Sequence, residues 1–182
     1  MKIVYRYFGK MKGESAAPPR ESFESMLWSF LGSFIGIAAV ALLHFNFLSD
    51  KALVLVIGSF GASAVLIYGA VESPLAQPRN LIGGHLISAF IGVTCYKLFP
   101  ESMWLASALA VSLSIFFMHF TITLHPPGGA TALIAVIGGE SIYSLGYKYI
   151  LLPAGTGAMI MLIIALLVNN LSKSRKYPYF WM

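Results

Sequence analysis

The stretch His125-Pro126-Pro127-Gly128-Gly129-Ala130-Thr131-Ala132 interrupts the most apolar half of the chain. Two prolines remove backbone donors and disfavour a helix that runs through them, and two glycines add a backbone freedom that an apolar helix does not need. Inside a membrane, polar side chains at an interrupted backbone usually mark a binding site or a solute path. The stretch therefore predicts an interrupted helix near residues 125–131, with a candidate site beside it.

The composition is that of a membrane protein. Of the 182 residues, 58% are hydrophobic and 10% are charged, whereas about a quarter of a soluble domain is charged. Solid apolar blocks argue against a β-barrel, whose strands alternate. We predict an all-α, polytopic helical membrane protein. The net charge of +5 comes mostly from the two tails, so it is an orientation signal and predicts no binding to nucleic acid.

Six apolar runs follow one another, and they are residues 26–48, 52–70, 81–98, 103–124, 130–137 and 147–171. The run 130–137 is too short to span a bilayer alone. We divide the chain into a polar basic tail (1–24), a transmembrane domain (25–172) and a basic, aromatic tail (173–182). Both tails are basic, which predicts two cytoplasmic termini and an even number of crossings. Six crossings fit, and so do four with two re-entrant segments.

The chain matches itself at an offset of 68 residues. Gly61-Ala62-Ser63-Ala64-Val65-Leu66 then lies over Gly129-Ala130-Thr131-Ala132-Leu133-Ile134, and Glu72-Ser73 lies over Glu140-Ser141. We predict two three-helix repeats, about 25–99 and 102–171, that are inverted and carry interrupted helices near 58–64 and 125–131. Paired interrupted segments are the best sequence pointer to the binding site of a transporter.

A helix that starts at Gly129 or Ala130 would have free backbone N–H groups and the positive end of its dipole inside the membrane, which suits a small anion. The same construction at Gly61 places Ser63 in the first turn of the other short helix. The competing interpretation is that the prolines and glycines only kink two helices for packing. The predicted substrate-binding residues are Gly61, Ser63, His125, Gly128, Gly129 and Thr131, with Gly58, Pro126 and Pro127 holding the break.

Three further polar residues start the third apolar run. Arg79, Asn80 and His85 are predicted at an entrance or at the membrane interface. Enzyme and metal motifs are poor, because His119 and His125 are six residues apart and have no nearby carboxylate. We expect no catalytic residues, no metal and no cofactor.

Together, these blocks resemble the HPP family of integral membrane proteins, which is named for the motif present here as His125-Pro126-Pro127. The similarity covers roughly residues 22–181 and includes residues 58–64, residues 73–80 and Gly83-Gly84-His85. The family is usually described with four transmembrane helices, and some members in chloroplasts and cyanobacteria are associated with nitrite transport. The resemblance thus implies an anion transporter, with nitrite as the leading substrate.

We therefore expect a transporter or channel for a small monovalent anion, which lies in the lipid bilayer of a bacterial inner membrane and forms a homo-oligomer. Two alternatives stay open. One is a channel for a neutral small molecule, and the other is a membrane anchor or assembly subunit without transport.

Overall fold

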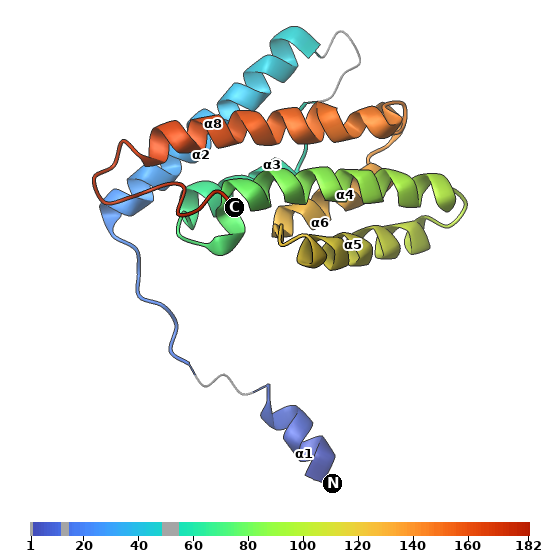
Figure 1. Cartoon of the computed structure of the whole chain (residues 1–182), viewed down its shortest axis with the longest axis horizontal. Coiled ribbons are helices and arrows are strands. Elements are labelled where there is room, and N and C mark those ends of the chain that lie inside the picture. The colour runs from blue at the N-terminus through green and yellow to red at the C-terminus, as the bar shows by residue number, and fades with distance from the viewer. Residues whose placement is uncertain (1, 12–14, 49–54) are drawn as a thin grey trace.

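The computed structural model describes residues 2–11, 15–48 and 55–182, and all of its regular elements are helical (Figure 1). The predicted all-α class is confirmed for these residues. Residues 49–54, which include the start of the predicted second apolar run (52–70), lie outside the described part. The short helix α1 (Lys2–Gly9) stands apart from the helical bundle in Figure 1.

Among the residues that the structure describes, four helical segments are long and apolar enough to cross a membrane. They are Phe23–Leu48, Pro78–Leu98, Met103–Phe120 and Gly146–Asn169. The first comprises α2 (Phe23–Leu43) and the π-helical turn η1 (His44–Leu48). The second and third are α4 and α5. The fourth comprises η5 (Gly146–Ile150), η6 (Leu151–Gly155) and α8 (Thr156–Asn169), and it is kinked at Leu152, whose φ of −132° and ψ of 117° are not helical.

Two helices are only about half as long. One comprises α3 (Ser59–Ala64) and the π-helical segment η3 (Val65–Gly69), and the other is α6 (Pro126–Ile137). At 1.5 Å per residue, α6 with its 12 residues is about 18 Å long, whereas the hydrocarbon core is about 30 Å thick. Of the two crossing counts that the sequence allows, four long helices with two half-length ones fit the structure, and six full crossings do not.

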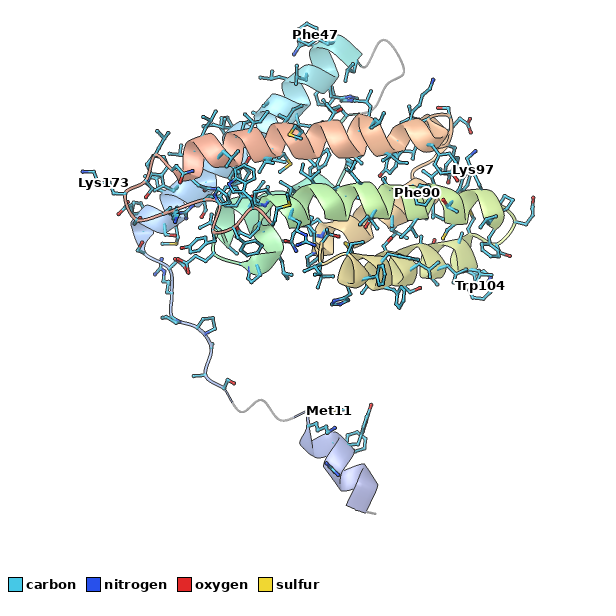
Figure 2. All side chains as sticks on the ribbon, viewed as in Figure 1. Met11, Phe47, Phe90, Lys97, Trp104 and Lys173 are labelled. Atoms are coloured by element: carbon cyan, nitrogen blue, oxygen red, sulfur yellow. The ribbon has the colours of Figure 1, made fainter. Side chains whose placement is uncertain are left out.

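The two short helices run in opposite directions from the middle of the bundle. We call the end that carries the C-terminal residues the tail end and the opposite end the far end. Arg175 bonds to the Tyr68 carbonyl, so η3 finishes at the tail end. Tyr143 of α7 (Glu140–Tyr143) bonds to the Val136 carbonyl and stacks on Tyr96 near the last turn of α4, so α6 finishes at the far end. In Figure 2, Lys173 marks the tail end, and Lys97 and Trp104 mark the far end.

The C-terminal residues close the tail end. Arg175 donates to the carbonyl and hydroxyl of Ser25 at the start of α2, so both chain ends of the bundle lie on one side. Burial lowers the pKa of the Arg175 guanidinium, and Glu21 and Glu24 oppose that shift. Tyr179 donates to Glu72, and this hydrogen bond raises the pKa of Tyr179. An even number of crossings agrees with this arrangement. That the tail end faces the cytoplasm stays a prediction.

The order of long, short and long helix occurs twice, in α2–α3–α4 and in α5–α6–α8. The helices α4, α5 and α6 pack tightly side by side, so the two halves meet along α4 (Figure 1). By contrast, α2 crosses α8 and is mostly unburied along its span. The predicted three-helix repeats and their inverted relation stay a prediction.

Candidate functional site

A buried cluster of histidines and hydroxyls forms where the two short helices overlap. Ser63 Oγ in α3 lies 3.0 Å from His125 Nε2, at the start of α6. A second contact joins the same two helices, because Ser59 Oγ at the start of α3 lies 2.9 Å from Thr131 Oγ1 in the second turn of α6. The N-terminal turns of the two helices therefore lie side by side and antiparallel, and the positive ends of both dipoles meet at the cluster.

His85 of α4 closes the cluster. Its Nε2 lies 2.8 Å from Ser63 Oγ, and its Nδ1 lies 2.7 Å from Thr131 Oγ1. The rings of His85 and His125 are 5.1 Å apart, centroid to centroid. Ser63 thus bridges the Nε2 atoms of two histidines. We call the side chains of Ser63, His85, His125 and Thr131 the cluster, and all four are at 0% exposure.

Three neighbours fix the orientation of these side chains. His125 Nδ1 lies 2.8 Å from the Leu75 carbonyl oxygen. Because a carbonyl can only accept, Nδ1 carries a proton. The Tyr149 hydroxyl donates to the Thr131 carbonyl at 3.1 Å, and the Phe60 ring packs edge-on against His85 at 5.3 Å. The cluster therefore draws on α3, α4, α6 and η5, and on the 3₁₀ turn η4 (Pro74–Ala76).

The helix at the break begins earlier than predicted. Its first residue is Pro126, and the expected start at Gly129 or Ala130 is wrong. Proline is well tolerated at the first helical position, where its missing N–H has no partner to lose. Since Pro126 and Pro127 have no N–H, and the Gly128 N–H bonds to the His125 carbonyl at 2.8 Å, few backbone donors remain for an anion. The polar character of the site comes from side chains.

Close helix packing explains two of the glycines. A Cβ on Gly84 would lie 2.5 Å from His125 Cβ, and a Cβ on Gly128 would lie 2.8 Å from the Gly84 carbonyl oxygen. No side chain fits between α4 and α6 at these positions. The glycines thus allow His85 and Thr131, which extend from these two helices, to reach each other.

The other two predicted glycines lie apart from the cluster. Gly61 is exposed, and no atom comes within 4 Å of a Cβ built on it. A Cβ on Gly129 would meet only Val111 of α5, at 3.8 Å. Gly58, predicted to hold a break, precedes α3 as its N-cap. Of the predicted substrate-binding residues, the structure brings together Ser63, His125 and Thr131, with Gly128 packed behind them.

Two of the three predicted entrance residues lie at a hollow on the tail end. Arg79 donates to the Thr121 carbonyl at 2.8 Å, and Asn80 donates to the Leu124 carbonyl at 2.8 Å. Both residues line a hollow of about 230 Å³, together with Leu75, His119 and Phe180. His85 differs from its predicted place, because it lies fully buried in the cluster, roughly 10 Å along α4 from Pro78.

Sequence reasoning missed two residues that bond to the cluster. Ser59 lies in the glycine-rich block and is four residues before Ser63, so helical spacing could have indicated that both face the same way. Tyr149 follows no motif, and only the fold brings it to α6. The offset of 68 residues does relate Ser63 to Thr131, and both hydroxyls bond back to the carbonyl four residues earlier, at 3.2 and 3.3 Å.

No group of three or more His, Cys, Asp or Glu that could hold a metal occurs in the described part of the chain. The cluster and its neighbours Ser59 and Tyr149 supply two imidazoles and four hydroxyls, which can donate and accept hydrogen bonds and exchange protons. It can therefore bind a small polar solute by hydrogen bonds, if the cluster opens to admit one.

Comparisons with known proteins agree with the resemblance drawn from the sequence motifs. A model of the family described as "HPP, transmembrane region" matches residues 18–178. Two transmembrane proteins of Dictyostelium discoideum are similar, one 49% identical over 97% of this chain and 57% of its own length, the other 46% identical over 98% and 64%. The chain thus spans about three fifths of these relatives. No solved structure matches it.

Proposed function

Because the chain belongs to the HPP family of transmembrane proteins, we propose that it transports a small monovalent anion across the membrane, with nitrite as the leading candidate. The anion passes through the cluster of Ser63, His85, His125 and Thr131. The choice of nitrite rests on the association of some HPP members with nitrite transport. We also propose that the membrane is a bacterial inner membrane. This location rests on the sequence-based expectation alone, because the two curated relatives come from a eukaryote.

One observation carries this proposal, namely two fully buried histidines bridged by one hydroxyl inside an apolar bundle. Polar and ionisable groups at membrane depth are expensive and are therefore usually kept for function. Imidazole N–H and hydroxyl groups donate hydrogen bonds, which an anion accepts. The dipoles of the Ser59–Gly69 and Pro126–Ile137 helices add positive potential at their N-terminal ends. Such a site holds an anion loosely enough to release it, because none of these four residues carries a fixed charge.

The hollow at the tail end is the anion's entrance. It is lined by Leu75, whose carbonyl bonds to His125, so the hollow and the cluster share one residue. Arg79 is half-buried at its wall and supplies a positive charge that attracts anions. Phe180 of the C-terminal tail also lines the hollow and narrows it.

The proposed path is closed in this conformation. The four cluster side chains are at 0% exposure and bond to one another, so an anion enters only when some of these bonds break. An alternating opening toward the two ends is the usual solution for sites at the meeting point of short helices.

Uptake into proteoliposomes tests the proposal. We expect nitrite uptake by the wild type above that of protein-free liposomes, with nitrate and formate as comparison anions. Ser63→Ala removes the bridging hydroxyl, whereas Ser112→Ala removes an exposed hydroxyl that bonds only within α5. A lost hydrogen bond to a charged solute is worth ~1.5–3 kcal/mol, so Ser63→Ala should slow uptake roughly tenfold or more, and Ser112→Ala should not. Absence of uptake of all three anions, or equal rates in both variants, would overturn the proposal.

A further inference from the structure

We propose that the bridged pair of His85 and His125 takes up one proton together with the anion, so that transport is coupled to protons. This inference rests on the proposed function and names the coupling ion at the same site. It follows from counting the protons that the hydrogen bonds of the cluster require.

With both histidines neutral, the geometry allows one complete assignment. The Leu75 carbonyl fixes the proton of His125 on Nδ1, so Nε2 must accept, and Ser63 donates to it. Ser63 Oγ is then left to accept from His85 Nε2. His85 Nδ1 consequently has no proton and accepts from the Thr131 hydroxyl at 2.7 Å.

The Thr131 hydroxyl has one proton but three acceptors within reach. Besides His85 Nδ1, these are Ser59 Oγ at 2.9 Å and the Pro127 carbonyl at 3.3 Å. A proton added to His85 Nδ1 reverses the bond, so that His85 donates to Thr131 and Thr131 turns its own proton to Ser59 Oγ. No new contact is needed and no N–H is left unpaired.

A proton added to the other histidine is held equally well. It would occupy His125 Nε2 and be donated to Ser63 Oγ, while Ser63 turns its hydroxyl proton to the Ser59 carbonyl at 3.2 Å. The hydroxyl between the two Nε2 atoms thus lets one proton be shared by the pair. Since the rings are 5.1 Å apart, two positive charges would repel strongly, and the pair holds one proton, not two.

Among the described residues, no side chain beside the histidine pair supplies a negative charge, so the anion is the partner for the added proton. The elements η4, α6, η6 and α8 carry no titratable side chain. Tyr149 and Tyr68 donate to main-chain carbonyls, and Arg79 is bonded to Thr121. The remaining titratable groups of α4, α5 and η5 are His119, at the tail-end hollow, and, toward the far end, Cys95, Tyr96, Lys97, Tyr147 and Lys148. The described carboxylates of the bundle lie in the end segments, and they are Glu21, Glu24, Glu72, Glu101 and Glu140.

A lone imidazolium at this depth would be a buried charge without a counter-charge, which is strongly disfavoured. A lone anion faces the same penalty. When both bind, each lowers the cost of the other, and this mutual stabilisation is the coupling free energy between proton and anion. The pair therefore moves as a neutral unit.

Separately imposed gradients test this inference in proteoliposomes that contain the wild-type protein. One proton with one monovalent anion is electroneutral. We therefore expect an inside-alkaline gradient to drive nitrite accumulation of up to about tenfold per pH unit. An inside-positive potassium diffusion potential, set with valinomycin at equal pH, should have no effect. Protein-free liposomes under the same gradients correct for leakage of nitrous acid.

Uptake that follows the potential and ignores the pH gradient would overturn the inference while leaving anion transport intact. No uptake under either gradient would overturn both. As a second readout, nitrite is added to purified protein in weak buffer, and a pH indicator should report about one proton taken up per anion bound. The variant with both His85→Gln and His125→Gln should lose this proton uptake, and His44→Gln, which changes a half-buried histidine outside the cluster, should keep it.

Discussion

Adjacent glycines at the start of α6 offer the sharpest test of the packing that builds the site. In Gly128→Ala, the new Cβ would lie 2.7 Å from Ser88 Oγ, 2.8 Å from the Gly84 carbonyl oxygen and 3.0 Å from Met118 Sδ. In Gly129→Ala, the nearest atom is Val111 Cγ1 at 3.8 Å, which is ordinary contact. The same substitution is thus made at two adjacent positions of one helical turn, and it creates a clash at Gly128 but none at Gly129.

The expected magnitudes follow from these distances. Ser88 and Met118 can turn aside, but the Gly84 oxygen is main chain and moves only with α4. Overpacking of this kind costs ~1–3 kcal/mol, whereas replacing glycine by alanine within a helix gains up to ~1 kcal/mol. We expect Gly128→Ala to lose about 1–2 kcal/mol of unfolding free energy and Gly129→Ala to gain up to about 1 kcal/mol.

Thermal unfolding in detergent, followed by tryptophan fluorescence, measures the difference. A gap of about 2 kcal/mol corresponds to ~4–8 °C for a chain of this size. Uptake measured well below both transitions should also fall in Gly128→Ala, because pushing α6 away from α4 lengthens the 2.7 Å contact between His85 and Thr131. If both variants unfold at the same temperature, or if Gly128→Ala is the more stable, the argument that α4 and α6 need a glycine here is refuted.

Three further predictions use the same unfolding assay or limited proteolysis. Ser114 has a buried hydroxyl without a partner, so Ser114→Ala should raise stability by ~1 kcal/mol, and a loss would contradict the bonding described. Tyr149→Phe should lower stability by ~1 kcal/mol because it removes a buried bond, and Tyr147→Phe, which removes only an exposed 3.2 Å bond to Thr94, should lower it much less. Arg175→Gln should speed cleavage of the C-terminal tail by proteases, since Arg175 ties it to α2, and equal cleavage of Arg175→Gln and Lys173→Gln would count against that role.

The apolar runs in the sequence predicted the helices well because burial in lipid leaves a strong compositional signal. Residues 81–98 and 103–124 correspond closely to α4 and α5. The helix starts were less accurate, because proline was read as holding a break when it begins a helix. The break lies in residues 121–125, where Ile122 has a positive φ of 56°, and the side chain of isoleucine gives no warning of such a conformation.

The site was predicted in part. Ser63 and Thr131 were found through the repeat, and His125 through the break, because these signals are local or periodic. The role of His85 was missed because the polar residues of α4 are spread around the helix and do not gather on one face, so its sequence does not indicate which face meets α6. The predicted homo-oligomer and the cytoplasmic location of the termini stay predictions.

Among the four long helices, α4 is the least apolar and the most buried, and half of its apolar stretch is buried within the bundle. This has a consequence for biosynthesis. When α4 leaves the ribosome, Ser63 has already been made, but His125, Thr131 and Tyr149 have not. His85 therefore waits in the membrane with half of its bonding unmet until the second half of the chain arrives. The hydrogen bonds of the cluster can therefore all form only after the second half of the chain has been synthesised. A chain truncated before residue 125 would keep an imidazole with an unpaired nitrogen, which membrane quality control could recognise.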